Sequence, residues 1–264
     1  MNDLEGRIAL VTGSATGLGR SMAVKLAQRG ADLIVNYSRS SDEAEECADL
    51  CRAEGAQVSV VQADVAQADG CHALVAAAAA RGRLDILIHS AGITRHAPDQ
   101  SDLDALSKDD FMDIYAVNVV GPYMMVQAAK PLLVAAHEQT GRASAVLNTS
   151  SIAGVLGIGS SVAYAASKGA LNTMTLSLAR ALGPSIRVNA VCPGFIGTRW
   201  FRDKMDEDAF AKVEQSIMAR TPLAAASGPD DIADAALFFV SDAARHVTGE
   251  TLLVDAGLHL GMPQ

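Results

Sequence analysis

The chain has 264 residues, of which 50% are apolar and 19% charged, and its formal net charge at pH 7 is −9. A chain of this length and composition can bury a substantial core, and it lies within the size range of one elaborated α/β domain. The negative charge argues against a protein that binds the phosphate backbone of a nucleic acid, because such proteins need clustered Lys and Arg.

Neither the start of the chain nor its longest uncharged stretch resembles a membrane segment. The first six residues include Asp3 and Glu5 and contain no apolar run of the kind that a secretory signal needs. The uncharged stretch 143–167 is interrupted by serines, whereas a transmembrane helix is more uniformly apolar. We therefore expect a cytoplasmic protein.

The cysteines are expected to be isolated thiols in a reducing compartment. Cys47 and Cys51 are four residues apart, Cys71 adjoins His72, and Cys192 stands alone. No two cysteines have the CxxC spacing of a zinc site and no HExxH pattern occurs, so no metal site is predicted.

In the first third of the chain, apolar runs alternate with helical patterns. The expected strands are 8–12, 32–37, 58–61 and 84–89. The helices expected between them are one that opens near Leu18 and covers 22–28, a polar one at 41–54 and an alanine-rich one at 69–81. Strands that alternate with helices in this way form a parallel sheet.

The same alternation continues after a polar loop at 94–103. A long helix is expected at 109–133, with a bend at Gly121-Pro122. Further helices are expected at 162–182 and 230–240, and further strands at 145–148, 186–191 and 251–254. No linker rich in Pro, Gly and Ser divides the chain. The sequence therefore predicts a single α/β domain over 1–264 with a doubly wound, mostly parallel sheet, which is a Rossmann fold.

A glycine-rich turn follows the first expected strand. Gly13, Gly17 and Gly19 permit a tight turn and the close approach of a phosphate group to backbone N–H groups. The N-terminus of the next helix favours negative charge. Although the spacing Gly-x3-Gly-x-Gly differs from the Gly-x-Gly-x2-Gly fingerprint, the turn predicts a site for the pyrophosphate of a dinucleotide.

The end of the second expected strand bears on the choice between NADP and NAD. In NAD-binding proteins, an acidic residue about 20 positions after the first glycine binds the ribose 2′-hydroxyl. Residues 35–40 contain no carboxylate, Asp32 lies at the opposite end of the strand, and Arg39 can pair with a 2′-phosphate. We therefore predict NADP as the cofactor, with NAD as the alternative.

Four residues further along the chain have a characteristic spacing. Tyr164 and Lys168 form a Tyr-x3-Lys pair on an expected helix, Ser151 stands 13 residues before the tyrosine, and Asn118 lies in the long helix. With the glycine-rich turn and in this order, these motifs resemble the short-chain dehydrogenase/reductase family over essentially the whole chain. The subset most similar in pattern is that of the 3-oxoacyl-acyl-carrier-protein reductases.

The resemblance implies an NADP(H)-dependent enzyme that interconverts a ketone and a secondary alcohol by hydride transfer, with Tyr164 as the general acid and base. Lys168 and the oxidised nicotinamide would lower the pKa of the tyrosine, because nearby positive charge stabilises phenolate. Lys168 would also hold the nicotinamide ribose. Ser151 would bind the substrate oxygen, and Asn118 would hold a water molecule in a proton relay.

The resemblance also assigns cofactor contacts to the turn, to the ends of four strands and to the helix that carries the tyrosine. These residues are Gly13, Ser14, Thr16, Gly17, Leu18, Gly19, Tyr37, Ser38, Arg39, Asp64, Val65, Ser90, Ala91, Gly92, Tyr164, Lys168, Pro193, Gly194, Ile196 and Thr198. One departure is His89-Ser90, where the family motif Asn-Asn-Ala-Gly begins with two asparagines. We expect this replacement to affect local stability more than the mechanism.

The segment 195–223 lies where loops cover the ligand crevice of an open α/β sheet. Its large apolar residues are Phe195, Trp200, Phe201, Met205, Phe210 and Met218. They fit equally a substrate lid over an apolar or bulky substrate and the ordinary packing of short helices. The resemblance further implies a homotetramer, or at least a dimer through the helices that carry Asn118 and Tyr164.

Two other functions stay open. One is an NAD-dependent dehydrogenase of a sugar, polyol or hydroxysteroid, which cofactor preference would distinguish. The other is a non-catalytic nucleotide-binding sensor, which would not need the proton donor Tyr164. A hydrolase is disfavoured because Ser151 does not lie in a Gly-x-Ser-x-Gly turn. The expected partner is a small carbonyl or alcohol substrate, and neither nucleic acid nor membrane.

Overall fold

A seven-stranded parallel sheet forms the centre of the computed structural model, which describes residues 3–202 and 205–261. The strand order is β3-β2-β1-β4-β5-β6-β7, and every neighbouring pair is parallel. This order confirms the predicted doubly wound Rossmann fold. The strands are β1 (Ile8–Thr12), β2 (Asp32–Tyr37), β3 (Val58–Gln62), β4 (Ile86–His89), β5 (Ser144–Thr149), β6 (Ile186–Pro193) and β7 (Thr251–Val254).

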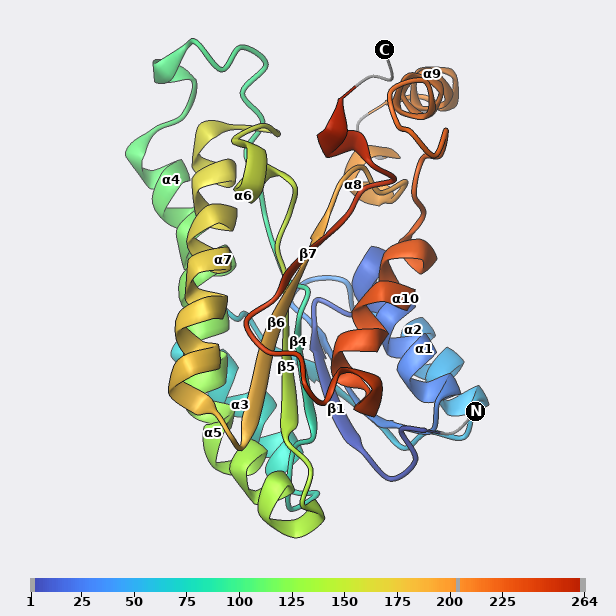
Figure 1. The fold of residues 1–264 in the computed structure, drawn as a ribbon, viewed down its shortest axis with the longest axis vertical. Coiled ribbons are helices and arrows are strands. Elements are labelled where there is room, and N and C mark those ends of the chain that lie inside the picture. The colour runs from blue at the N-terminus through green and yellow to red at the C-terminus, as the bar shows by residue number, and fades with distance from the viewer. Residues whose placement is uncertain (1–2, 203–204, 262–264) are drawn as a thin grey trace.

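Helices cover both faces of the sheet (Figure 1). The helices on one face are α1 (Gly17–Gln28), α2 (Ser41–Ala53) and α10 (Pro229–Val240). Those on the other face are α3 (Ala68–Ala79), α5 (Gly121–Thr140) and α7 (Val162–Leu182). Because side chains alternate along a strand, β1 supplies both cores: Ala9 and Val11 pack on the first face, and Ile8 and Leu10 on the second.

The segment predicted as one bent helix over 109–133 has three parts. It consists of α4 (Lys108–Tyr115), a π-helical turn (Ala116–Val120) and α5, which continues to Thr140. The irregular turn therefore precedes Gly121-Pro122, because proline is tolerated in the first turn of α5, where its missing N–H is not needed. By length and composition, Lys108–Thr140 also meets the criterion for a membrane-spanning helix, but here it packs against α3, β5 and α7.

Short elements gather at the carboxyl ends of the strands. They are α6 (Ala153–Leu156), α8 (Arg199–Arg202) and α9 (Glu207–Met218), and Figure 1 shows all three at the upper end of the sheet. Single 3₁₀ turns occur at Leu103–Ala105, Asp242–Ala244 and Leu258–Leu260, and the turn at Asp242–Ala244 lies at the opposite end of the sheet. The carboxyl edge of a parallel sheet is where open α/β proteins bind their ligands.

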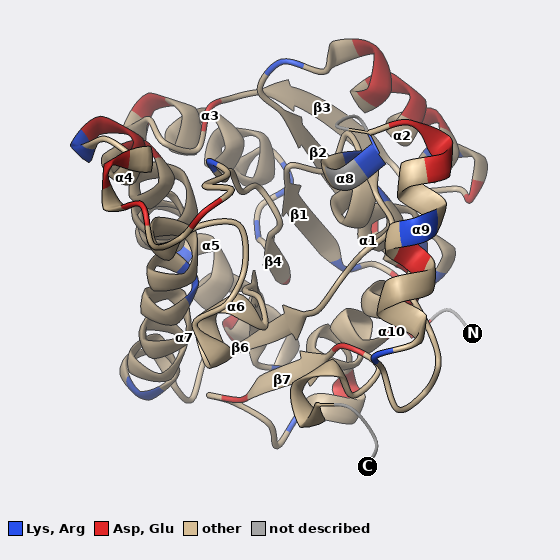
Figure 2. Ribbon diagram, turned by 90° about the horizontal axis from the view of Figure 1, so that it is seen from above, with Lys and Arg blue, Asp and Glu red and all other residues tan. Residues whose placement is uncertain are grey.

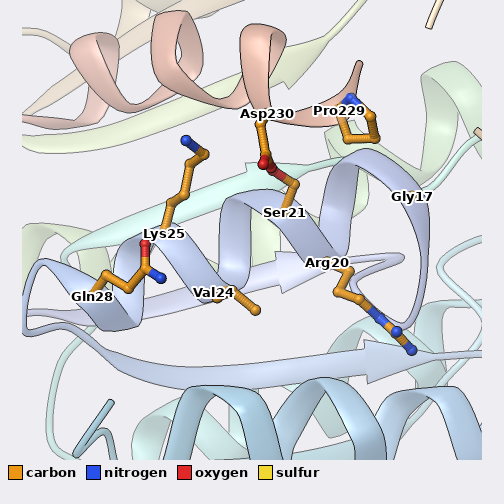
Figure 3. Close-up of a pocket in the computed structure, with 8 residues that line it drawn as sticks. All are labelled: Gly17, Arg20, Ser21, Val24, Lys25, Gln28, Pro229 and Asp230. Atoms are coloured by element: carbon orange, nitrogen blue, oxygen red, sulfur yellow. The ribbon is translucent and has the colours of Figure 1, made fainter. Parts of the chain in front are cut away.

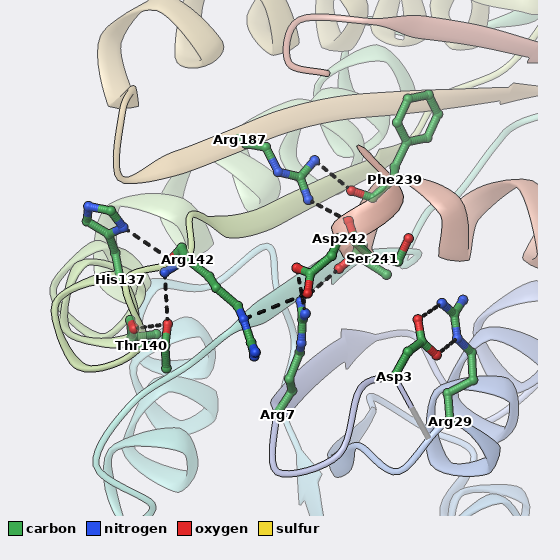
Figure 4. A network of polar contacts seen from close by, with 12 residues as sticks. Asp3, Arg7, Arg29, His137, Thr140, Arg142, Arg187, Phe239, Ser241 and Asp242 are labelled. Atoms are coloured by element: carbon green, nitrogen blue, oxygen red, sulfur yellow. Dashed lines mark hydrogen bonds and ion pairs between the residues drawn. The ribbon is translucent and has the colours of Figure 1, made fainter. Parts of the chain in front are cut away.

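At the opposite end of the sheet, two buried arginines hold the C-terminus of α10 (Figure 4). Arg187 of β6 donates a hydrogen bond to the carbonyl oxygen of Phe239 at 2.8 Å. Arg7 donates to the carbonyl oxygen of Val240 at 3.4 Å and forms an ion pair with Asp242 at 2.7 Å. A helix C-terminus leaves carbonyl groups without partners and attracts cations, so these contacts anchor α10 away from the carboxyl edge.

Candidate active site

The glycine-rich turn leaves no room for side chains. Gly13 has φ +64°, and a Cβ atom there would lie 2.8 Å from the backbone nitrogen and Cα of Ala91. A Cβ atom at Gly19 would lie 2.3 Å from the carbonyl oxygen of Gly13. The turn therefore packs directly against the segment after β4, and only glycine permits that contact.

The first turn of α1 is suited to an anion. Its N-cap residue Thr16 makes no side-chain capping hydrogen bond, and the first turn contains no acidic residue. The N–H groups of this turn and the positive end of the helix dipole fit the pyrophosphate of a dinucleotide. The hydroxyl of Ser14 points inward instead: it donates to the carbonyl oxygen of Val11 at 2.8 Å and accepts from the Asn36 N–H at 2.9 Å.

Two residues that the sequence analysis did not select brace this turn. The side chain of Asn36 accepts a hydrogen bond from the Gly13 N–H at 3.0 Å and donates to the carbonyl oxygen of Ala63 at 3.0 Å. The hydroxyl of Thr12 accepts hydrogen bonds from the N–H groups of Ser90 and Ala91, both at 3.2 Å. The sequence signal that could have identified Thr12 and Asn36 is a polar residue at or near the end of an otherwise apolar strand.

The ends of β2 and β3 lie side by side, as the parallel sheet requires. The N–H of Ala63 donates to the carbonyl oxygen of Tyr37 at 2.9 Å. Tyr37 is half-buried, whereas Ser38, Arg39 and Asp64 are exposed. Within residues 3–202 and 205–261, the Arg39 side chain has no hydrogen bond or ion pair, so its guanidinium is available to a phosphate.

Tyr164 and Lys168 lie one turn apart on α7. The hydroxyl of Ser161, the N-cap of this helix, accepts a hydrogen bond from the Tyr164 N–H at 3.2 Å. The ammonium Nζ of Lys168 lies 5.6 Å from the centroid of the Tyr164 ring and donates to the carbonyl oxygen of Thr149 at 2.8 Å. The lysine thus joins α7 to the end of β5.

Ser151 lies just beyond β5, where it is buried and its hydroxyl accepts a hydrogen bond from the Ala153 N–H at 3.1 Å. Burial raises the pKa of Tyr164, and hydrogen bonding with Ser151 opposes this rise. The lowering of the tyrosine pKa by Lys168 together with the oxidised nicotinamide concerns the cofactor-bound enzyme and stays a prediction. Burial also lowers the pKa of Lys168 to about 8.

Asn118 lies in the π-helical turn and is buried. Its side chain accepts a hydrogen bond from the Ile93 N–H at 2.9 Å and donates to the Ile93 carbonyl oxygen at 3.0 Å and to the Ser167 hydroxyl at 3.1 Å. A Cβ atom at Gly92 would lie 3.4 Å from its Oδ1 and 3.7 Å from Nζ of Lys168. The side-chain amide thus positions the loop after β4, while the water relay stays a prediction.

The loop after β6 returns to the glycine-rich turn. Pro193 is buried at the end of β6, and a Cβ atom at Gly194 would lie 2.7 Å from Cβ of Asp255. A Cβ atom at Gly17 would lie 3.6 Å from the methyl group of Thr198. The predicted nicotinamide-side loop and pyrophosphate turn are therefore neighbours, and Ile196 of this loop forms a parallel bridge to Ser227.

Trp200 on α8 lies against the predicted catalytic tyrosine. The ring centroids of Trp200 and Tyr164 are 6.2 Å apart, with planes tilted by 50°. Arg199 forms an ion pair with Glu43 of α2 at 2.7 Å, which links the segment 195–223 to the cofactor side of the fold. The side chain of Phe201 and residues 203–204 of this segment lie outside the described part of the chain.

The replaced family position His89 is buried on β4. Neither of its ring nitrogens has a hydrogen-bond partner among the described residues, and burial lowers its pKa to about 3. Asn148, its register partner on β5, donates a hydrogen bond to Thr175 at 2.9 Å. Ser90 retains a backbone role through its N–H, which donates to Thr12.

A cavity of about 450 Å³ lies between α1 and α10 (Figure 3). The cations that line it are already paired: Lys25 lies 2.6 Å from Asp234, and Arg20 lies 3.0 Å from Glu46. Of the predicted site residues only Gly17 lines it, so it is separate from the cluster around Tyr164. Its lining residues are Gly17, Arg20, Ser21, Val24, Lys25, Gln28, Pro229 and Asp230.

The sequence matches a known family along nearly its whole length. A family model described as Enoyl-(Acyl carrier protein) reductase matches residues 13–259. A Streptomyces violaceoruber protein whose name assigns it to the granaticin polyketide synthase as a ketoacyl reductase is 39% identical over 97% of each chain. A 3-oxoacyl-acyl-carrier-protein reductase of Staphylococcus aureus is 34% identical over 96% of this chain and 98% of its own.

Relatives with other named activities are similarly close. An L-rhamnose 1-dehydrogenase (NAD(P)(+)) of Sphingomonas is 35% identical over 99% of this chain and 100% of its own. The crystal structure of carveol dehydrogenase from Mycobacterium avium in complex with NAD is 30% identical, has a TM-score of 0.85, and is matched over 98% of this chain and 100% of its own. The chain therefore belongs to the short-chain dehydrogenase/reductase family, and it is an oxidoreductase that acts on CH–OH groups with a nicotinamide cofactor.

Proposed function

We propose that this enzyme is an NADP(H)-dependent reductase of ketones, similar to the 3-oxoacyl-acyl-carrier-protein reductases. The observation that carries the proposal is the cluster of Tyr164, Lys168 and Ser151 at the carboxyl edge of the sheet, next to a glycine-rich turn that suits a pyrophosphate. A sensor that only binds nucleotide has no need of a half-buried tyrosine beside a buried ammonium.

In this proposal the bound cofactor supplies a hydride to the carbonyl carbon of the substrate. Ser151 donates a hydrogen bond to the carbonyl oxygen and stabilises its developing negative charge. Tyr164 transfers its phenolic proton to that oxygen, which completes the alcohol. Lys168 lies 5.6 Å from the tyrosine ring, and its ammonium stabilises the phenolate that remains. In the oxidative direction, the same phenolate takes the proton back.

NADP is favoured over NAD by the end of β2. Arg39 is exposed, and residues 38–40 contain no carboxylate that would repel a 2′-phosphate. The guanidinium can bind such a phosphate with two parallel hydrogen bonds. Three of the glycines assigned to the cofactor would line its path. A Cβ atom at Gly13 would lie 2.8 Å from the backbone of Ala91. A Cβ atom at Gly17 would lie 3.6 Å from Thr198, and one at Gly92 would lie 3.7 Å from Nζ of Lys168.

The segment 195–223 is proposed as the substrate lid. It begins beside the pyrophosphate turn, through Thr198, and it brings Trp200 against Tyr164. It also contains α9, whose Phe210 packs against Phe195 with ring centroids 6.1 Å apart. The two interpretations of this segment, a lid and the packing of short helices, are therefore compatible.

We also propose a homodimer or homotetramer that forms through α4, α5 and α7. These helices lie together on the outer side of one face of the sheet (Figure 1). Their outward side chains include an apolar set, and apolar faces of this kind are typical of protein interfaces. This set is Phe111, Met112, Val120, Tyr123, Val162 and Leu176. A cytoplasmic location, proposed likewise, suits the four free and buried thiols.

The alternative is an NAD-dependent dehydrogenase of a sugar, polyol or hydroxysteroid. The relatives named for L-rhamnose and for carveol, the latter solved with NAD, favour it. The acyl-carrier substrate in turn predicts a basic surface around the site entrance. Figure 2, which looks onto the end of the molecule that carries α8 and α9, shows basic residues on α8, the helix beside Tyr164, and acidic residues along α2 and around α4.

The test is a parallel titration with NADPH and NADH, followed by reduction assays on a panel of ketones. The fluorescence of Trp200, the only tryptophan, reports on the lid. Tighter binding of NADPH together with ketone turnover supports the proposal. Higher kcat/KM with NADH would favour the dehydrogenase alternative, and cofactor binding without turnover of any carbonyl or alcohol would favour the sensor.

A further inference from the structure

Trp200 has a fixed place beside the proposed proton donor. Its ring lies 6.2 Å from that of Tyr164, and 36% of its surface is exposed. The helix α8 that carries it is held by the ion pair between Arg199 and Glu43, and Thr198, just before α8, lies beside the glycine-rich turn. The indole is therefore both anchored and accessible.

The loop after Ser151 also lies against Tyr164. A Cβ atom at Gly159 would lie 3.6 Å from Cδ1 of the tyrosine, so this loop passes directly along the ring. It is fixed by the Ala97 N–H, which donates to the carbonyl oxygen of Ser160 at 2.8 Å. Trp200 and the loop at Gly159, which both lie against the tyrosine ring, are thus each held in place by a further contact.

Apolar side chains are exposed on this loop and on the α6 helix within it. Val155 and Leu156 are each 45% exposed, and Ile158 is 46% exposed. Figures 1 and 2 show α6 and α8 on either side of the carboxyl ends of the central strands. Exposed aliphatic side chains thus belong to the loop that passes along the ring of the proposed proton donor, and the indole of Trp200 lies against the same ring.

Three arginines near this region are already engaged. Arg199 is paired with Glu43, Arg95 lies 3.2 Å from Asp110, and the guanidinium of Arg202 stacks on Phe210 at 4.4 Å from the ring centroid. A substrate with several hydroxyl groups or a phosphate needs matching polar partners in its site. These three arginines therefore leave no unpaired charge for such a substrate.

We propose that Trp200 is a specificity-determining residue that selects ketones with a flat, apolar ring next to the carbonyl group. In the bound state the ring lies against the indole of Trp200 and the aliphatic side chains of α6 and Ile158, while the carbonyl oxygen reaches Tyr164 and Ser151. Stacking against an aromatic wall favours aryl and conjugated cyclic ketones over open-chain ketones and over sugars. This inference rests on the proposed ketone reductase and names its substrate class.

The test compares Trp200→Ala and Trp200→Phe with the wild type, using NADPH and two ketones that differ in one ring, acetophenone and 2-butanone. We expect Trp200→Ala to lower kcat/KM for acetophenone about tenfold and to change that for 2-butanone by less than about threefold. Trp200→Phe should restore most of the loss. Leu50→Ala, which removes an exposed apolar side chain of α2 outside the segment 195–223, is the matched control and should leave kcat/KM for both ketones unchanged.

An equal loss on both ketones, or no loss on either, would overturn the role of Trp200. A separate readout distinguishes this failure from that of the proposed reductase. Acetophenone should quench the fluorescence of Trp200 in the enzyme saturated with NADPH, whether or not it is reduced. Quenching without turnover of either ketone would reject the reductase and retain the aromatic site, whereas turnover without quenching or ring preference would do the reverse.

Discussion

Lys168 of α7 donates a hydrogen bond to the carbonyl oxygen of Thr149, 2.8 Å away at the end of β5. This contact holds the ammonium 5.6 Å from the centroid of the Tyr164 ring, inside the protein. Burial disfavours the charged form, so it lowers the pKa of Lys168 to about 8. Lys168 is therefore fully protonated well below pH 8 and loses its positive charge as the pH rises through that value.

Ketone reduction should accordingly weaken above about pH 8, because the neutral amine no longer stabilises the phenolate of Tyr164. Lys168→Arg should move this decline to higher pH, since a guanidinium stays charged, even though its different shape lowers the maximal rate. The measurement is kcat/KM against pH for both proteins at saturating NADPH. A decline at the same pH in both would assign it to a group other than Lys168.

Removing the phenolic hydroxyl should separate catalysis from cofactor binding. In Tyr164→Phe the ring still packs against Trp200 and the loop at Gly159, so the fold and the pyrophosphate turn should be preserved. The loss of a general acid should lower kcat by about 10²- to 10⁴-fold. Calorimetry should give a Kd for NADPH close to that of the wild type.

Tyr123→Phe is the matched control, because this tyrosine is exposed on α5 and should tolerate the same change. A Tyr164→Phe variant that retains most of its kcat would remove Tyr164 from the proposed role.

The preference for NADP should depend on Arg39. Arg39→Ala removes the exposed guanidinium that faces the expected 2′-phosphate. A hydrogen bond to a charged group contributes about 1.5–3 kcal/mol, so kcat/KM with NADPH should fall roughly tenfold to a hundredfold. The value with NADH should not change. Arg180→Ala, at the other end of α7 from Tyr164, provides the control. Equal losses with both cofactors would show that Arg39 does not read the phosphate.

Most elements could be predicted because each strand is a short apolar run bounded by turns. β1, β2, β7 and α7 have the predicted bounds. The π-helical turn Ala116–Val120 could not be predicted in the same way. The buried side chain of Asn118 in that turn binds Ile93, 25 residues away, and a long-range contact leaves no periodic signal in the local sequence.

The spacing of side chains in the sequence predicted the candidate site, whereas the contributions of backbone groups could not be predicted from it. Tyr164, Lys168 and Ser151 come together as their spacing predicted. Thr149 was missed because it contributes only a carbonyl oxygen, which every residue has. Asn36 was missed because its amide acts on a neighbouring turn, Gly13, rather than on a ligand. Burial raises the pKa of Tyr164 in this structure, and a sequence does not reveal the degree of burial, whereas the lowering expected with the bound oxidised cofactor stays a prediction.

The unusual residue His89 should make the protein sensitive to acid. It is 2% exposed, it has no hydrogen-bond partner within the described residues, and burial lowers its pKa from 6.5 to about 3. Between these two values the unfolded chain binds a proton that the folded protein does not. The contribution of neutral His89 to the free energy of unfolding is therefore largest above about pH 6.5. It decreases as the pH falls, by up to about 1.4 kcal/mol for each pH unit.

His89→Leu should remove this dependence, because leucine fills a similar volume and does not titrate. From pH 7 to pH 5 the wild type should lose about 2 kcal/mol of unfolding free energy through His89, and the variant should lack that part of the loss. Urea unfolding at both pH values measures it, with the exposed His246→Asn as the control. An identical pH dependence in His89→Leu and the wild type would mean that the imidazole of His89 titrates normally in the folded protein, and hence that it reaches a proton acceptor or solvent there.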